Sequence, residues 1–360
     1  MGRSESPGCW TARRNRNGSS KMVFAQRSHG KDIGPPKAWS PSDHFDGKRF
    51  FNPTLPKDFA PSRRSTLKMA REPRSRWPAW VENMGVPRLN EMLGANEVAI
   101  TFVNHATFLI QTGGISILTD PVWSERASPF RWIGPKRVRK PGLAIEDLPT
   151  IDIVLLSHNH YDHLDVATLT RLRQRFAPTV LAAAGDARIV GPIGFKDVRE
   201  LDWWDEIQFN DTLHVTFVPA QHFSARGLFD RQKSLWGGYM IESRGRRVYF
   251  AGDTGYSTHF SDIRNRLGSP DIAMLGIGAY EPRWFMKPIH MNPAEAVCAH
   301  RDLGSKQSIG MHFGTFQLTT EAFDQPLADL ERARAETGIP EGEFVTLHEG
   351  ETRIFRTDAP

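Results

Sequence analysis

The chain contains a cluster of metal-binding residue types directly after an apolar run. Residues 158–163 read His-Asn-His-Tyr-Asp-His, and the preceding residues 151–156 are largely apolar. Such a run predicts a strand that is buried on both faces. Imidazole and carboxylate groups in this pattern suit zinc, and iron or manganese are alternatives. The cluster therefore predicts a hydrolase that holds two metal ions at the end of a buried strand.

Three further candidate ligands stand at the ends of other predicted strands. His222 follows a strand predicted at 213–219, Asp253 follows one at 247–251, and His312 lies near the end of one at 308–313. Ligands on a rigid scaffold can be held to the tolerances that a metal requires. The complete set would give each of two ions three or four protein ligands, with one aspartate able to bridge them: His158, His160, Asp162, His163, His222, Asp253 and His312.

The apolar pattern predicts strands and helices that alternate along the chain. Strands are expected at 98–103, 107–111, 115–119, 151–156, 179–184, 213–219, 238–242, 247–251, 272–277 and 308–313, with a closing β segment at 344–355 that is broken at 349–350. Helices are expected at 164–176, at 293–301 after an Asn292 N-cap, and at 320–337 with Thr319 or Thr320 as its cap. This alternation predicts an α/β fold in which helices cover both faces of a two-sheet core.

Charge is distributed unevenly along the 360 residues. The first 78 residues contain 17 Lys and Arg against 6 Asp and Glu, a balance of +11, and the remainder has a balance of −6. We expect a disordered basic arm at 1–40, an irregular extension packed on the body at 41–97, and the hydrolase domain at 98–360. The arm is interpreted as a solvated tail, with an anionic membrane surface as the alternative partner and no nucleic acid expected.

Targeting features in the sequence are few. No apolar stretch approaches the roughly 18 residues that a membrane-spanning helix needs. Arg13-Arg14 is not followed by the apolar region of a secretory signal. Cys9 and Cys298 are the two cysteines, which favours a reducing compartment over a disulfide framework. These features predict a cytoplasmic protein, with peripheral membrane association as an open alternative.

Several strings of residues are similar to one group of hydrolases. The histidine cluster and the later His, Asp and His resemble the metallo-β-lactamase superfamily, whose fold is an αββα sandwich of two mixed sheets covered by helices. Longer strings resemble its N-acyl-phosphatidylethanolamine-hydrolysing phospholipase D branch and the bacterial relatives of that branch: 106–110 (ATFLI), 119–121 (TDP), 134–137 (GPKR), 201–204 (LDWW) and 278–286 (GAYEPRWFM). One departure is Asn104, which stands where many relatives have glycine.

The resemblance implies a role for each candidate residue. Two zinc ions would be bound, the first by His158, His160 and His222, the second by Asp162, His163 and His312, with Asp253 bridging. Asp120 would support the metal loop without binding metal, and His290 would stabilise the substrate phosphate or protonate the leaving group. The residues expected in the substrate-lining stretches are Arg131, Trp132 and Trp284.

The resemblance also implies an activity and leaves two alternatives open. It implies phospholipase D-type hydrolysis of an N-acyl-phosphatidylethanolamine-like lipid to an N-acylethanolamine and phosphatidic acid, by a homodimer. One alternative is a lactonase, a nuclease-like phosphodiesterase or a cyclic-phosphate hydrolase on the same site. The other is a membrane-surface or adaptor protein without catalysis. The complete ligand set favours an enzyme, because a non-catalytic copy has no chemical need for all seven residues.

Overall fold

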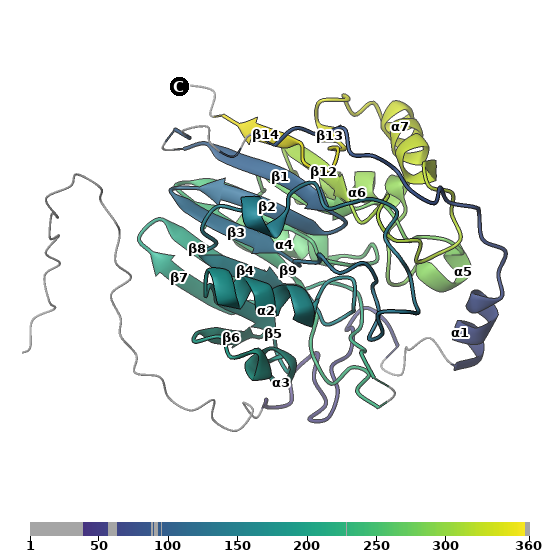
Figure 1. Ribbon diagram of the computed structural model, residues 1–360, viewed down its shortest axis with the longest axis horizontal. Helices are drawn as coiled ribbons and strands as arrows, with labels where there is room; N and C mark the ends of the chain where they lie inside the picture. The colour runs from purple at the N-terminus through teal and green to yellow at the C-terminus, as the bar shows by residue number, and fades with distance from the viewer. Residues whose placement is uncertain are drawn as a thin grey trace, which may run out of the picture. The chain divides into compact units, whose positions relative to one another are not determined.

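The computed structural model describes residues 39–56, 63–87, 89, 93–94, 96–227 and 229–356, so residues 1–38 of the predicted basic arm lie outside this description. The strands form two seven-stranded sheets (Figure 1). The first sheet has the order β14 (Thr352–Phe355), β1 (Val98–Asn104), β2 (Thr107–Thr112), β3 (Ile115–Thr119), β4 (Ile153–Leu156), β5 (Thr179–Ala183) and β6 (Val198–Leu201). The second has the order β13 (Phe344–Val345), β12 (Gln307–Met311), β11 (Ile272–Gly276), β10 (Arg246–Phe250), β9 (Gly238–Ser243), β8 (Leu213–Val218) and β7 (Glu206–Asn210).

The two sheets share one pattern of strand directions. In the first sheet, β14, β1, β2 and β3 pair antiparallel, and β3 to β6 pair parallel. In the second, β7 to β10 pair antiparallel, and β10 to β13 pair parallel. Both sheets are therefore mixed, and in each the fourth strand of this series, β3 or β10, is where the pairing changes.

Helices cover the outer faces of the two sheets, which confirms the predicted αββα sandwich. On the first sheet, Leu169 and Leu172 of α2 (Val166–Arg175) pack in a cluster with Val154 of β4. On the second, α4 (His259–Leu267) and α6 (Pro293–Leu303) contribute Phe260 and Val297 to the core. The remaining helices are α1 (Arg63–Ala70), α3 (Ala187–Val190), α5 (Arg283–Met286), α7 (Gln325–Thr337) and the 3₁₀ helices η1 (Ile145–Asp147) and η2 (Gly191–Ile193).

Three features of the predicted elements differ from the structure. Strands β6 and β7 and helices α1, α3, α4 and α5 were not expected from the sequence. The last helix begins at Gln325 and not at 320, because the Thr319 hydroxyl donates to Glu321 (2.5 Å) and that carboxylate accepts from the backbone N–H of Ala279 (2.6 Å). The closing β segment is split between the sheets, since β13 joins the second and β14 the first. The predicted Asn292 N-cap of α6 is confirmed, and its side chain forms a capping box with Glu295.

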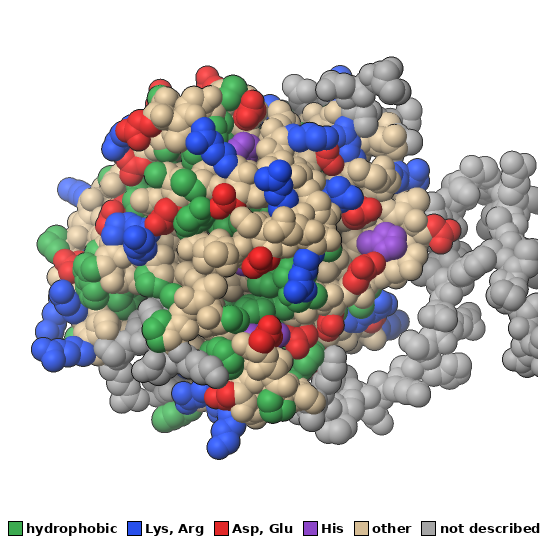
Figure 2. Space-filling model, turned by 180° about the vertical axis from the view of Figure 1, so that it is seen from behind, with side chains coloured by type: hydrophobic (Ala, Val, Ile, Leu, Met, Phe, Trp, Pro, Cys, Tyr) green, Lys and Arg blue, Asp and Glu red, His purple; other side chains and the backbone are tan. Residues whose placement is uncertain are grey.

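The surface carries mixed charge. On the face shown in Figure 2, Lys and Arg side chains are interspersed with Asp and Glu, and hydrophobic side chains lie between them. Such interspersed charge is usual for a solvated protein surface. None of the described helices combines the length and the apolarity that crossing a bilayer would require.

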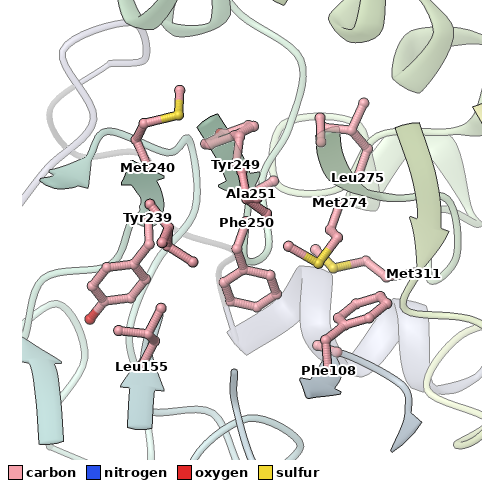
Figure 3. Close-up of a cluster of buried hydrophobic side chains, with 14 of the residues drawn as sticks. Phe108, Leu155, Tyr239, Met240, Tyr249, Phe250, Ala251, Met274, Leu275 and Met311 are labelled. Atoms are coloured by element: carbon pink, nitrogen blue, oxygen red, sulfur yellow. The ribbon is translucent and has the colours of Figure 1, made fainter. Parts of the chain in front are cut away.

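The core between the sheets is built from side chains of both (Figure 3). Phe108 of β2, Leu155 of β4 and Phe250 of β10 are fully buried and lie together. Burial of each such side chain contributes about 1.5–3 kcal/mol. Tyr239 of β9 adds a polar tie, because its hydroxyl lies 2.8 Å from the carbonyl oxygen of Leu156, which it can donate to across the core. The second sheet is therefore fixed to the strand that immediately precedes the histidine cluster.

Candidate metal centre

The predicted ligands meet at one edge of the sandwich, where strands of both sheets end. Four of them lie in the loop after β4, and one follows each of β8, β10 and β12. They form two neighbouring groups whose ligand atoms lie within 4.8 Å of one another: His158, His160, His222 and Asp253 in the first, and His105, Asp162, His163 and His312 in the second. The structure thus brings all seven predicted ligands together and adds His105.

Asp253 lies between the two groups. Its Oδ2 atom is 3.0 Å from Nε2 of His163 and 3.2 Å from Nε2 of His312. The same oxygen is 3.7 Å from Nε2 of His158 and 3.8 Å from Nε2 of His222. A single carboxylate oxygen therefore faces nitrogen atoms of both groups, as a bridging ligand would.

The residues at this edge fit divalent metal. Oδ1 of Asp253 is buried without a hydrogen bond, and Nε2 of His163 and Nε2 of His312 face carboxylate oxygens without forming a hydrogen bond of good geometry. Buried polar atoms without a partner are costly, and a cation coordinated by them would remove that cost. Imidazole nitrogens with carboxylate oxygens are the donor set of zinc, iron and manganese sites.

The electrostatics of the first group favour neutral imidazoles, the form that binds metal. Burial lowers the pKa of His160 to about 3 and the pKa of His222 to about 4. In the second group, burial likewise lowers the pKa of His105 to about 3. His312 behaves differently, because burial lowers its pKa but the neighbouring carboxylates of Asp253 and Asp162 outweigh burial and raise the pKa to about 9. Metal binding there would displace a proton from His312.

Hydrogen bonds behind the ligands orient their rings. Buried Asp120 accepts from the backbone N–H of Ser157 (2.7 Å) and from Nδ1 of His163 (2.7 Å), so Nε2 of His163 faces the centre. Nδ1 of His222 donates to the carbonyl oxygen of Ile289 (2.9 Å), which likewise leaves Nε2 for a metal. Such partners fix the tautomer and the direction of a metal-binding imidazole. Asp120 therefore has the geometry of the predicted supporting role.

His105 was not expected among the ligands. It lies in the turn between β1 and β2 with a left-handed backbone (φ +50°), and it is fully buried. Its Nε2 atom is 3.0 Å from Oδ2 of Asp162, and its ring centroid is 4.0 Å from that of His312. A left-handed histidine costs conformational energy and is often found at functional sites. The signal in the sequence was a histidine two residues after the end of the predicted strand at 98–103.

Arg226, which holds the ligand loop after β4 in place, was also not predicted from the sequence. The guanidinium of Arg226 donates to the carbonyl oxygens of Asn159 (2.9 Å) and Leu164 (2.7 Å), which lie at the two ends of the loop. It also stacks over the ring of Tyr161 at 3.9 Å. The side chain of Asn159 donates in turn to buried Asp186 (3.0 Å). Arg226 therefore holds a loop of the first sheet from a segment that follows β8 of the second.

The N-terminal extension supports His222. The amide side chain of Asn52 donates to the carbonyl oxygen of His222 (2.8 Å) and accepts from its backbone N–H (3.2 Å). Thr54 donates to the side chain of Gln221 (2.6 Å). Earlier in the extension, the two ring nitrogens of His44 each lie 2.6 Å from a carboxylate, Nδ1 from that of Asp43 and Nε2 from that of Asp202. Residues 44–54, here called the strap, therefore connect the body to the ligand loop after β8.

A cavity of about 170 Å³ opens beside the ligands. Its polar lining residues include His160, Asp162, Asp253 and His290. Its apolar lining residues are Met69, Phe223, Phe285, Met286, Ile289 and Leu318. Nε2 of His290 is 3.9 Å from Oδ2 of Asp253, which places the predicted phosphate-contacting residue next to the candidate bridging ligand.

The predicted substrate-lining residues do not line this cavity. Trp132 is 74% exposed, and Arg131 beside it is also exposed. The ring of Trp284 faces α1, where Lys68 lies 4.3 Å from it and Glu72 accepts its indole N–H (3.1 Å). Successive residues on a helix project in different directions, so Phe285 enters the cavity and Trp284 does not.

Comparison with known proteins identifies the family of this fold. Residues 116–313 match the family described as the beta-lactamase superfamily domain. The chain belongs to the beta-lactamase superfamily. Within this superfamily it is 41% identical over 263 residues to N-acyl-phosphatidylethanolamine-hydrolyzing phospholipase D 1 of Caenorhabditis elegans, which covers 70% of this chain and 74% of the relative. The predicted resemblance is thereby confirmed.

One further relative and one solved structure are similar to this chain. The mitochondrial N-acyl-phosphatidylethanolamine-hydrolyzing phospholipase D of Saccharomyces cerevisiae is 38% identical over 224 residues, 61% of this chain and 48% of that protein. The solved structure of Igni18, a metallo hydrolase of Ignicoccus hospitalis, covers 73% of this chain and 100% of its own with a TM-score of 0.56 and 22% identity. The last likeness shows the fold. Together with the His and Asp cluster, these relatives identify a metallo-hydrolase fold suited to divalent metal.

Proposed function

We propose that this protein is a dinuclear zinc hydrolase that cleaves the phosphodiester of N-acyl-phosphatidylethanolamine-like lipids. The observation that carries the proposal is the 41% identity over 263 residues with a phospholipase D of that specificity. The reaction would add water across one phosphorus–oxygen bond, giving an N-acylethanolamine and phosphatidic acid. His158, His160, Asp162, His163, His222, Asp253 and His312 would hold the two ions.

The cavity supports an amphipathic substrate. Polar side chains of the ligand cluster and apolar side chains that include Phe223, Phe285 and Leu318 line the same cavity. A phosphodiester held at the ligand cluster would leave an attached acyl chain against the apolar side chains, where burial contributes about 0.8 kcal/mol for each methylene group. A small polar phosphodiester would gain nothing from these apolar side chains.

The chain's own residues define what happens at the phosphate. A bound pair of divalent cations supplies Lewis acidity and lowers the pKa of water toward neutrality. Burial lowers the pKa of His290 well below its ordinary value, so this imidazole is neutral. A neutral imidazole can donate one N–H to a phosphoryl oxygen, whereas protonation of a leaving group requires the charged form. The neutral form of His290 therefore favours stabilisation of the phosphoryl oxygens over protonation of the leaving group.

The decisive experiment compares substrates and identifies the products by mass. Zinc-loaded protein is incubated with N-acyl-phosphatidylethanolamine, unmodified phosphatidylethanolamine, a long-chain lactone and bis-p-nitrophenyl phosphate. We expect an N-acylethanolamine and phosphatidic acid, loss of both products after chelation, and recovery when zinc is restored. Turnover of the lactone without turnover of the lipid would replace this proposal with the lactonase alternative.

Metal content is a separate measurement. We expect about two zinc equivalents per chain in protein purified without chelator, by elemental analysis. A value near one would contradict the dinuclear centre even if the lipid were hydrolysed. The homodimer and the membrane association stay predictions. Light scattering tests the first, and vesicle flotation tests the second.

A further inference from the structure

A second cleft lies at the edge of the sandwich opposite the candidate metal centre. It has a volume of about 670 Å³, within the roughly 300–1,000 Å³ of small-molecule sites. It is formed where β11 and β12 begin, at the turn between β9 and β10, and at β14, which runs antiparallel to β1. The metal ligands follow the other ends of these sheets, so the cleft is separate from the catalytic cavity.

The side chains of this cleft are predominantly cationic. It is lined by Arg244, Arg246, Lys306, Arg353 and Arg356, with Asp271 as the one acidic side chain among the lining residues. The sequence after residue 78 has a balance of −6, and the face in Figure 2 shows acidic and basic groups interspersed. Arg356 is paired with Glu97 (3.2 Å), which does not line the cleft, so the lining residues themselves keep an excess of positive charge.

The single carboxylate in the cleft is already in use. Asp271 accepts from Nζ of Lys306 (2.7 Å), from Nη1 of Arg246 (3.2 Å) and from the backbone N–H of Arg247 (2.9 Å). Nε of Arg246 is buried and has no hydrogen-bond partner in the structure. A buried guanidinium nitrogen without an acceptor indicates that an anionic ligand would be stabilised beside it.

Two arginines on opposite walls have no acidic partner. Among the described residues, neither Arg244 nor Arg353 forms an ion pair, and Arg353 contacts only the ring of Phe355, at 5.6 Å. Arg244 belongs to the second sheet and Arg353 to the first. Packed sheets lie about 10 Å apart, so one phosphate group would not reach both walls. A ligand that carries two or more phosphate groups would.

We propose that this cleft binds a small polyanion with at least two phosphate groups, held by bidentate contacts from arginines of both sheets. The shared chemistry is the phosphate cluster, which a free metabolite such as a nucleoside triphosphate or the headgroup of a phosphoinositide could present. The site does not depend on the lipid hydrolysis proposed above, because no residue of the cleft contacts the metal ligands.

Calorimetry on the zinc-loaded full chain tests the proposal with pyrophosphate and ATP as free probes. The double variant Arg244→Gln/Arg353→Gln removes one cation from each wall while it leaves the metal centre intact. We expect binding to the unmodified chain to weaken about tenfold or more for each arginine removed. The matched control is Arg171→Gln/Arg332→Gln, which removes the same charge from exposed arginines elsewhere and should bind as the unmodified chain does.

A second arm distinguishes the source of the phosphate groups. Vesicles of phosphatidylcholine with about 5% phosphatidylinositol 4,5-bisphosphate are compared with pure phosphatidylcholine. Binding of the free probes, or of the phosphoinositide vesicles alone, supports the proposal if the double variant weakens it. Binding of unchanged affinity in the double variant overturns the proposal, as does no binding at all. An unchanged thermal midpoint and unchanged hydrolase activity show that the double variant is folded.

Discussion

The two sheets of this protein repeat one architecture but use it differently at the metal centre. In each sheet an aspartate follows the strand where the pairing changes from antiparallel to parallel, Asp120 after β3 and Asp253 after β10. A histidine likewise follows β1 and β8, namely His105 and His222. Asp253 lies among the ligand nitrogens, whereas Asp120 lies behind them, against Ser157 and His163.

The two aspartates differ in position because of the loop that lies next to each of them. In the first sheet, the loop after β4 carries four ligands and stands between Asp120 and the centre. In the second sheet, the ligands are spread over three loops, and the segment directly after β11 contributes none of the seven. We therefore propose that equivalent positions acquire different roles, one as a metal ligand and one in support of a ligand. The variants below test that division.

The largest effect is expected at Asp253. Asp253→Asn removes the carboxylate that faces both groups, so we expect turnover to fall below detection and bound zinc to drop. Elemental analysis and a lipid-hydrolysis assay measure the two quantities. Near-normal activity in this variant would mean that the aspartates of the two sheets do not differ in the way proposed.

Asp120→Asn should have a smaller effect, because it alters only the orientation of a ligand. We expect zinc affinity to fall by roughly 10- to 100-fold while two ions still bind at saturation. Competition with a fluorescent chelator gives the affinity. The matched control is Asp152→Asn at the opposite end of β4, where the carboxylate accepts from Ser116, and its zinc affinity should be unchanged. An Asp120 variant that binds one ion at saturation would make Asp120 a ligand.

Arg226→Lys tests the link between the segment after β8 of the second sheet and the ligand loop after β4 of the first. One nitrogen of Arg226, Nη1, donates to the carbonyl oxygens of both Asn159 and Leu164, while the guanidinium plane stacks on Tyr161. Lysine keeps the positive charge, but its ammonium has no plane to stack on Tyr161 while it donates to the two carbonyls. We expect a loss of roughly tenfold in zinc affinity, the lower end for residues that support ligands. Arg199→Lys, an exposed arginine paired with Asp197, is the control. Equal affinity in both variants would show that the ligand loop needs no clamp.

The smallest effect concerns the strap beneath His222. Burial lowers the pKa of His44, but hydrogen bonds with Asp202 and Asp43 outweigh it, and the net pKa is raised. The stability contributed by protonated His44 is therefore fully present below about pH 6.5 and is lost as the pH rises through the raised value. We expect His44→Gln to lower the urea midpoint at pH 5.5 more than at pH 9. An equal loss of the urea midpoint at both pH values would contradict a stabilising role for protonated His44.

Much of this centre could be predicted from the sequence, for reasons that particular residues make clear. His158 to His163 form a local pattern after a buried strand, and His222, Asp253 and His312 became interpretable once their strands were recognised. Arg226, Asn52 and Asp186 gave no such signal, because each acts through partners far away in the chain. The start of α7 was wrong for the same reason, since Glu321 binds the backbone of Ala279 and not its own helix.

The position of β14 has a consequence for how the chain reaches its native state. It is the last of the described strands, yet it pairs with β1, the first, through Val98 to Thr101. During synthesis, β1 to β6 would emerge before β14, so β1 would be an unpaired edge strand of their sheet. An unpaired edge strand is a template for association with other chains. Truncation before residue 352 should therefore produce a protein that aggregates, although every proposed metal ligand would be retained.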